Sequence, residues 1–126
     1  MKELKFFKCD HCKNVTTVLS GTNKPTICCG EMMHELVAQT ADAAGEKHVP
    51  VITRSENNEL VVTVGSTEHP MLENHYIQFI VLETETGFRV EYLEPGQKPT
   101  AKFYEDEKVI AVYEYCNIHG LWKVEA

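Results

Sequence analysis

The chain has 126 residues, a net charge of −7 at pH 7 and an apolar share of 43%. This length predicts one domain, or a small module joined to a modest domain, and the apolar share is enough for a folded core. Nineteen acidic against twelve basic residues argue against a nucleic-acid partner, which needs a basic face. Neither an apolar run of about 18 residues nor a signal-peptide pattern is present, so we expect a cytoplasmic protein without a membrane partner.

Residues 1–36 are rich in cysteines and turn-forming residues and predict a small module. Its β-branched run at 15–19 predicts a strand. A segment below about 40 residues buries too little surface to fold unaided and usually needs a metal or disulfides. Because the cytoplasm is reducing, metal binding or redox chemistry explains the cysteines better than a disulfide framework does.

Four cysteines of this module have the spacing of a metal site. Cys9 and Cys12 form a Cys-x-x-Cys pair, and Cys28 and Cys29 follow after fifteen intervening residues. Four thiolates suit zinc or iron, and the spacing does not choose between the two metals. Adjacent residues of an extended chain point to opposite faces, so we expect the backbone to turn at the second pair, with Gly30 supplying the torsions.

A linker and a β region follow the module. Residues 37–47 are small and polar and predict the linker, and the pattern from residue 48 onward is that of short strands. Seven runs rich in Val, Ile, Tyr and Phe are separated by turn signals, at 49–53, 59–64, 75–82, 88–93, 101–104, 109–115 and 121–124. Short strands at this spacing without a helix predict an antiparallel β-sandwich over 48–126.

Four histidines and the fifth cysteine lie at strand ends or turns of this β region, at His48, His69, His75, Cys116 and His119. Each histidine alone would be taken as structural, but the group together favours a shared metal. Five ligands exceed the four of structural zinc and leave one octahedral position open. A mixed nitrogen and thiolate shell suits a redox-active ion such as iron, and a thiolate opposite the open position donates electron density to the metal.

Glu46 and Lys47 directly precede His48. If His48 binds the metal, Lys47 is placed to attract a small anion and Glu46 to cap the vacant position once the metal is oxidised. The alternative is an ordinary solvated charge pair within the linker.

Taken together, these segments resemble desulfoferrodoxin, the two-iron class of superoxide reductase, over essentially the whole chain. The matching segments are FKCDHC at 7–12, CCG at 28–30, EKHVPVI at 46–52, HPM at 69–71, HYIQ at 75–78 and EYCNIHGLW at 114–122. Their order, content and spacing make the resemblance specific. One departure is Lys13, which follows the first cysteine pair where the module often carries glycine.

The resemblance implies the identity of both metals. The first is an iron bound by Cys9, Cys12, Cys28 and Cys29. The second is an iron with four equatorial imidazoles and one axial thiolate, from His48, His69, His75, His119 and Cys116. Lys47 corresponds to the family's anion-attracting lysine, and Glu46 to the carboxylate that ligates ferric iron.

The resemblance also implies a fold and an activity. The fold is mainly β, with a rubredoxin- or desulforedoxin-like metal module at 1–36 followed by an immunoglobulin-like antiparallel β-sandwich, usually assembled as a cytoplasmic homodimer. The activity is the one-electron reduction of superoxide to hydrogen peroxide, with rubredoxin or a similar protein as electron donor.

Other functions account for parts of the sequence. A zinc-stapled β-sandwich serving as a binding or scaffold module explains the four clustered cysteines but not the group of five ligands. An electron carrier with a closed second iron site explains both groups, and it differs from an enzyme in giving no response to added anions. Superoxide dismutation is a further possibility, which the product ratio distinguishes.

Overall fold

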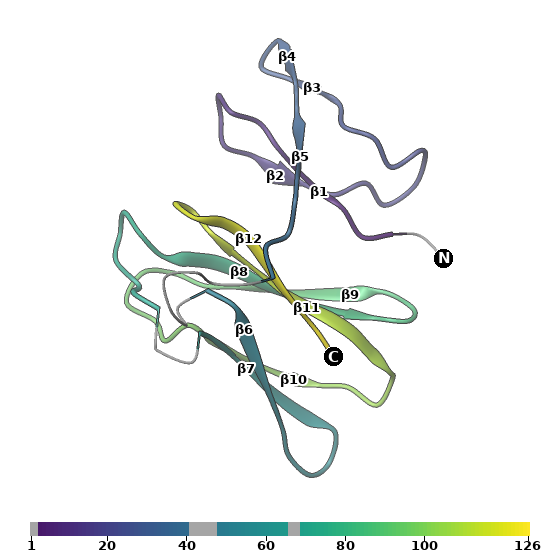
Figure 1. Cartoon of the computed structure of the whole chain (residues 1–126), viewed down its shortest axis with the longest axis vertical. Helices are drawn as coiled ribbons and strands as arrows, with labels where there is room; N and C mark the ends of the chain where they lie inside the picture. Colours follow the sequence, from purple (N-terminus) through teal and green to yellow (C-terminus); the bar gives the residue numbers. More distant parts are fainter. Residues whose placement is uncertain (1–2, 41–47, 66–68) are drawn as a thin grey trace. The chain divides into compact units, whose positions relative to one another are not determined.

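The computed structural model describes residues 3–40, 48–65 and 69–126, which fold as two compact units, Met1–Val37 and Ala38–Ala126. Each unit has its own sheets (Figure 1). Each also has its own cluster of buried side chains. The predicted linker at 37–47 falls largely on residues 41–47, which lie outside the described residues, so its bounds stay a prediction.

Two small antiparallel sheets make up the described part of the first unit. One has the strand order β2-β1-β5, and the other is the hairpin β3-β4. The strands are β1 (Phe6–Lys8), β2 (Val15–Thr16), β3 (Ile27–Cys28), β4 (Glu31–Met32) and β5 (His34–Leu36). Phe7, Cys9 and Met33 are buried together as the core of this unit. So few apolar side chains form a minimal core, as expected of a segment that needs a metal to fold.

The strand predicted at 15–19 is shorter in the structure and ends at Thr16. The hydroxyl of Thr17 donates a hydrogen bond of 2.7 Å to the carbonyl of Lys5. A threonine that bonds a backbone group in this way offers the chain an alternative to the strand ladder. The remaining strands of the first unit were not predicted, because two or three residues are too few to show alternation.

The described residues of the second unit form two antiparallel sheets, drawn as two layers in Figure 1. Their strand orders are β10-β7-β6 and β12-β11-β8-β9. The strands are β6 (Pro50–Arg54), β7 (Glu59–Val64), β8 (Ile77–Thr84), β9 (Phe88–Tyr92), β10 (Thr100–Tyr104), β11 (Val109–Cys116) and β12 (Gly120–Glu125). The predicted fold class is confirmed, with a four-cysteine unit followed by an antiparallel β-sandwich.

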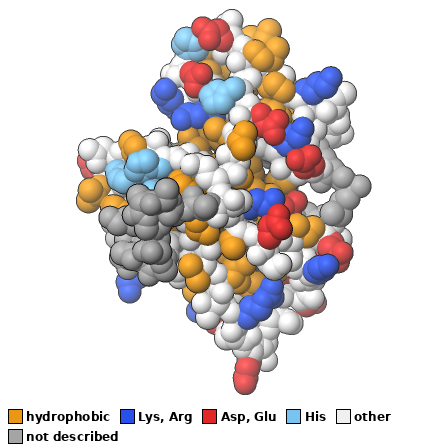
Figure 2. All heavy atoms as spheres, viewed as in Figure 1, with side chains coloured by type: hydrophobic (Ala, Val, Ile, Leu, Met, Phe, Trp, Pro, Cys, Tyr) orange, Lys and Arg blue, Asp and Glu red, His pale blue; other side chains and the backbone are white. Residues whose placement is uncertain are grey.

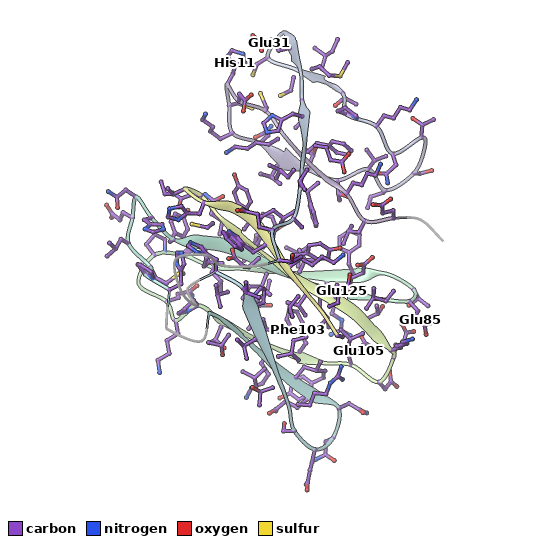
Figure 3. The ribbon with its side chains drawn as sticks, in the orientation of Figure 1. His11, Glu31, Glu85, Phe103, Glu105 and Glu125 are labelled. Atoms are coloured by element: carbon purple, nitrogen blue, oxygen red, sulfur yellow. The ribbon has the colours of Figure 1, made fainter. Side chains whose placement is uncertain are left out.

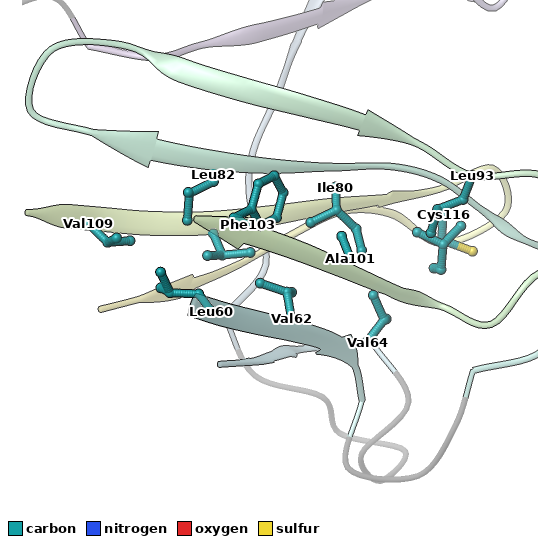
Figure 4. Close-up of a cluster of buried hydrophobic side chains, with 12 residues drawn as sticks. Leu60, Val62, Val64, Ile80, Leu82, Leu93, Ala101, Phe103, Val109 and Cys116 are labelled. Carbon is teal, nitrogen blue, oxygen red and sulfur yellow. The ribbon is translucent and has the colours of Figure 1, made fainter. Parts of the chain in front are cut away.

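The core of the second unit lies between the two sheets. In β7, buried side chains alternate with half-buried ones, so that Leu60, Val62 and Val64 point inward. Ile80 and Phe103 come from the opposite sheet and from β10, and they belong to the same buried cluster (Figure 4). Cys116 lies at one end of the cluster in Figure 4, so the metal-capable thiol belongs to the hydrophobic core itself.

The strand predicted to start at His75 starts instead at Ile77. Leu72 and His75 each donate a backbone hydrogen bond to the carbonyl of the other, at 2.9 and 3.1 Å. This closed turn holds His75 outside the sheet, although its neighbours carry strand-forming side chains. The difference matters for function, because it frees the imidazole of His75 to point toward other ligands at the sheet end.

Charged side chains of both signs are interspersed over the face shown in Figure 2. One ion pair of the second unit joins Lys102 and Glu59, at 3.8 Å. Within the described ranges, no helix is long and apolar enough to cross a membrane.

Candidate metal centres

The four cysteines of the first unit are brought together at one end of its two sheets. Their sulfur atoms all lie within 4.8 Å of one another, and the sulfurs of Cys12 and Cys28 are 3.6 Å apart. A tetrahedral ion with metal–sulfur bonds of about 2.3 Å requires sulfur–sulfur distances of about 3.8 Å. The cluster therefore fits a single four-coordinate ion. Cys9 is buried, whereas Cys12 and Cys29 are exposed.

Left-handed backbone conformations shape the loops that carry these cysteines. Cys29 has a φ of 54° and Gly30 a φ of 81°, so the expected turn after Cys28 is present but shared between two residues. In the other loop, Lys13 has a φ of 68°, and its amide donates a hydrogen bond of 3.0 Å to the carbonyl of Cys9. The strained residues let both loops curl tightly enough to turn their sulfurs toward one point.

The electrostatics of the cluster favour a cation. The amide N–H of Cys12 lowers the pKa of Cys9 to about 6, so this thiol ionises readily. Interaction with the sulfurs of Cys12 and Cys9 raises the pKa of Cys28 to about 12, and the pKa of Cys29 is also raised. One thiolate therefore suppresses the ionisation of its neighbours. A divalent ion removes this conflict, because it stabilises all of the thiolates at once.

Two ion pairs lie beside the cysteine loops. The Nε2 atom of His11 is 3.0 Å from a carboxylate oxygen of Glu31, and Figure 3 shows the two side chains next to each other. The Nδ1 atom of His34 is 3.4 Å from a carboxylate oxygen of Asp10. Both pairs are exposed, and each joins the loop of the first cysteine pair to the β4–β5 segment. These histidines face carboxylates, and the sulfur cluster is complete without them.

The second group of ligands gathers at one end of the β-sandwich. Its donor atoms lie within 4.8 Å of one another and belong to His48, His69, His75, Cys116 and His119. All five come from strand ends or turns. His48 precedes β6, His69 and His75 precede β8, Cys116 ends β11, and His119 lies in the turn to β12.

The four imidazoles of this group form a closed cycle. Ring centroids are 4.8 Å apart for His48 and His69, 4.8 Å for His69 and His75, 4.9 Å for His75 and His119, and 4.6 Å for His119 and His48. Neighbouring rings meet edge-on, with interplanar angles between 70° and 81°. Such a cycle presents four nitrogen atoms to one central point, as a square-planar set of ligands requires.

Hydrogen bonding fixes which nitrogen of His69 faces that centre. The Nδ1 atom lies 2.6 Å from the carbonyl oxygen of Pro70, which can only accept, so Nδ1 carries the proton. The Nε2 atom is buried and has no hydrogen-bond partner among the described residues. A buried lone pair without a donor is unfavourable unless an ion is bound there, and a metal-bound histidine typically donates its other N–H to a carbonyl in this way.

The distance between the ring nitrogens of His48 and His119 also fits a shared metal ion. The Nε2 atom of His48 lies 3.0 Å from the Nδ1 atom of His119. Two nitrogens bound to one ion at about 2.1 Å, with a right angle between the bonds, would be about 3.0 Å apart. The two nitrogens therefore occupy the positions of adjacent metal ligands.

The thiol of Cys116 reaches the group from the core. Its side chain is fully buried, and its sulfur accepts a hydrogen bond of 3.4 Å from the backbone amide of His119. Burial raises the pKa of Cys116, while the amide N–H groups of His119 and Ile118 act in the opposite direction. The thiolate form thus needs a cation nearby, and its amide partners orient it toward that cation.

Three supporting residues were not predicted from the sequence. The indole of Trp122 stacks on the imidazole of His48, and the side-chain amide of Gln39 donates a hydrogen bond to the carbonyl of His119. Asn117 uses both ends of its amide. Its nitrogen donates to the carbonyl of Asn74, and its oxygen accepts from the backbone amide of Tyr76. The residues on both sides of His75 are therefore bonded to one side chain. Only Asn117 carried a local signal, because asparagine is favoured in turns.

Glu46 and Lys47 lie outside the described residues. Their roles therefore stay predictions from the sequence, which places them immediately before His48.

Fold and sites define a class of protein, a β-sandwich metalloprotein with one tetrathiolate cluster and one cluster of four imidazoles and a thiolate. The family model described as Desulfoferrodoxin matches residues 40–125. A desulfoferrodoxin of Syntrophotalea carbinolica is 44% identical over 124 residues, and one of Nitratidesulfovibrio vulgaris is 42% identical over 124 residues, with 98% of both chains covered in each case. The chain belongs to the desulfoferrodoxin family of superoxide reductases.

A solved structure agrees with this assignment over both units. The crystal structure of the superoxide reductase from Treponema pallidum aligns with a TM-score of 0.83 and 30% sequence identity, covering 98% of each chain. The similarity therefore includes the four-cysteine unit as well as the β-sandwich.

Proposed function

We propose that this chain reduces superoxide to hydrogen peroxide at an iron bound by His48, His69, His75, His119 and Cys116. Each turnover consumes one superoxide, one electron and two protons. The observation that carries the proposal is the closed cycle of four imidazoles, with the buried Nε2 of His69 inside it and the thiol of Cys116 at its core side. Iron bound there would supply the electron and a positive charge that attracts the anion.

The ligands of this site divide the work between them. The imidazoles are neutral nitrogen donors, and their edge-on packing leaves little freedom for any ring to rotate away. Cys116 would bring the single negative charge and increase the electron density on a bound iron, as a thiolate ligand does in some haem enzymes. Because Cys116 reaches the cycle from the hydrophobic core, we propose that a small ligand binds at the opposite face.

Lys47 and Glu46 are proposed to act at that opposite face. The net charge of −7 repels an anion, so a local positive charge is needed to raise the encounter rate. Lys47 directly precedes the ligand His48 and is the nearest cation along the chain. Glu46 is proposed to occupy the open position after oxidation, when no substrate is bound.

The tetrathiolate cluster is proposed to hold a second iron, by analogy with the family, and to stabilise the first unit. The family resemblance supports rubredoxin or a similar small redox protein as electron donor, a homodimer as the assembly, and the cytoplasm as the compartment.

The test begins with metal analysis and visible spectra before and after ascorbate and a stronger oxidant. Two irons per chain, with two chromophores that differ in potential, are expected. Pulse radiolysis of the reduced protein should then show rapid bimolecular loss of superoxide and formation of peroxide without dioxygen. Dioxygen in equal amount would indicate dismutation instead. A colourless protein that retains only zinc after reconstitution with iron would favour the scaffold function.

Two substitutions separate the roles of the charged pair. Lys47→Ala should slow capture of superoxide and weaken the dependence of its rate on salt, since a charge that steers the anion is removed. Glu46→Ala should leave capture nearly unchanged and alter the spectrum of the oxidised protein. An unchanged bimolecular rate in the first variant, or a collapse of the rate in the second, would contradict these assignments.

A further inference from the structure

Gln39 is fastened to the turn that carries His119. Its backbone pairs with β12, where its amide donates to the carbonyl of Leu121 at 3.0 Å and its carbonyl accepts from the amide of Lys123 at 2.9 Å. Its side-chain Nε2 donates to the carbonyl of His119 at 2.8 Å. The carbonyls of His119 and Leu121 both lie near this side chain and can only accept hydrogen bonds. The nitrogen end of the side-chain amide must therefore face them.

The carbonyl of His119 also accepts a second hydrogen bond. The Nε1 atom of Trp122 donates to it at 3.2 Å, so two donors converge on one oxygen. The next residue, Gly120, has a φ of 87°, and a Cβ atom there would lie 3.5 Å from the Nε2 of Gln39. The carbonyl is thus held from two sides in a turn that only glycine adopts without strain.

His119 also interacts with the sulfur of Cys116. The backbone amide of His119 bonds the sulfur of Cys116 at 3.4 Å, and the Nδ1 of its ring faces the centre of the imidazole cycle. The amide and the carbonyl of His119 are separated by only two backbone torsions. Fixing the carbonyl therefore restricts how the amide can point toward the sulfur.

We propose that Gln39 is a positioning residue that maintains the hydrogen bond from the His119 amide to the Cys116 sulfur, and that it thereby tunes the reduction potential of the metal at the second site. The inference rests on the proposed function, because it requires a redox-active metal bound by these ligands. Hydrogen bonds to a coordinating sulfur withdraw electron density and are an established lever on potential. A weaker bond makes the thiolate a stronger donor, which stabilises the oxidised metal and lowers the potential.

The proposal can be tested without disrupting the fold, because the two shortest bonds between Gln39 and β12, at 3.0 and 2.9 Å, are made by its backbone. Gln39→Ala removes the side-chain donor, and Gln39→Glu keeps the size of the side chain but offers no N–H to a carbonyl. Gln97→Ala is the matched control, since the side-chain Oε1 of Gln97 accepts a local hydrogen bond of 2.8 Å from the backbone amide of Glu94, in the connection between β9 and β10.

The measurements are made on the iron-loaded full-length protein. Redox titration should show a lower potential for the second iron in both Gln39 variants, and its charge-transfer band should move to longer wavelength. The first iron, read from its own band in the same sample, should keep its potential. Gln97→Ala should match the wild type in every respect.

A lower thermal midpoint of the metal-free Gln39 variants, with an unchanged potential and band in the loaded protein, would assign Gln39 a purely structural role and overturn the proposal. An equal shift in Gln97→Ala would overturn it as well. Failure of the proposed function would appear differently, as a wild-type iron protein that does not react with superoxide, because the potential and band are measured without superoxide.

Discussion

The indole of Trp122 lies nearly parallel to the imidazole of His48, with ring centroids 4.7 Å apart and an interplanar angle of 17°. The same indole donates to the carbonyl of His119 at 3.2 Å. One side chain therefore supports two adjacent members of the imidazole cycle, the first through its face and the second through its N–H group.

Substitution of Trp122 should separate these two contributions. Trp122→Phe keeps an aromatic face but loses the N–H donor, and Trp122→Leu loses both. We expect metal to be held at the second site in the order wild type, Phe, Leu, with a total loss of affinity of about 10–100-fold, the range for partners of metal ligands. Competition with a chelator, followed by the loss of the second chromophore, measures this order. Equal affinities of the Phe and Leu variants would show that the face contributes nothing.

Asn117 should position His75 in a similar way. Its amide donates to the carbonyl of Asn74 at 3.1 Å and accepts from the amide of Tyr76 at 2.9 Å. Asn117→Ala removes both bonds, whereas Asn117→Asp keeps the acceptor. We expect the Asp variant to release its second metal to a chelator at a rate between those of wild type and Ala. The first chromophore serves as the internal control, and its release rate should not change.

Lys13 should be replaceable by glycine with a gain in stability. Its φ of 68° costs an L-residue about 1–2 kcal/mol, against about 0.5–1 kcal/mol of extra chain entropy that glycine loses on folding. Lys13→Gly should therefore stabilise the first unit by about 0.5–1 kcal/mol and slow the release of its metal. Lys13→Val, a β-branched residue, should have the opposite effect. Faster metal release from the glycine variant would indicate that the bond of 2.6 Å from Lys13 Nζ to the Asp10 carbonyl outweighs the strain.

The metal-free second unit should lose stability in mild acid because of His69. Burial lowers the pKa of this imidazole from 6.5 to about 4. Between these values the unfolded chain binds a proton that the folded chain does not. The free energy of unfolding is therefore at its full value above pH 6.5 and falls as the pH is lowered toward 4. The loss that His69 causes has an upper limit of about 3 kcal/mol.

Urea unfolding at several pH values, followed by the fluorescence of the single tryptophan, Trp122, measures this dependence. His69→Gln removes the titrating group and should flatten the curve between pH 6.5 and pH 4. Identical pH profiles for the two proteins would contradict the assignment.

The strands of the second unit could be predicted because each is long enough to show its pattern. Alternation of β7 over Glu59–Val64 is visible in the sequence and matches the burial of its side chains. Strands of two or three residues, such as β3 and β4, leave no such pattern. They depend on the turn at Cys29 and Gly30, where both residues have a positive φ, and no hydrophobic alternation indicates that turn.

The donor residues of both clusters could also be predicted, since cysteine and histidine are few and their spacing is distinctive. The order of the imidazoles around the cycle and the nitrogen that each presents could not, because both depend on hydrogen bonds such as that of His69 to Pro70. Gln39 carried no local signal. It is a single polar residue in a small-residue segment, and its partner His119 lies 80 positions away.

The two clusters differ in how much of the chain must be in place before they exist. In the first, Cys9 and Cys28 are 19 positions apart and Cys29 follows directly, so all four cysteines lie within one short segment. In the second, His48 and His119 are 71 positions apart, and the last ligand lies close to the final strand. A chain that stops before His119 therefore contains all four cysteines but lacks one member of the imidazole cycle. The proposed iron site therefore depends on long-range folding of the β-sandwich, whereas the tetrathiolate cluster depends only on contacts within a short segment.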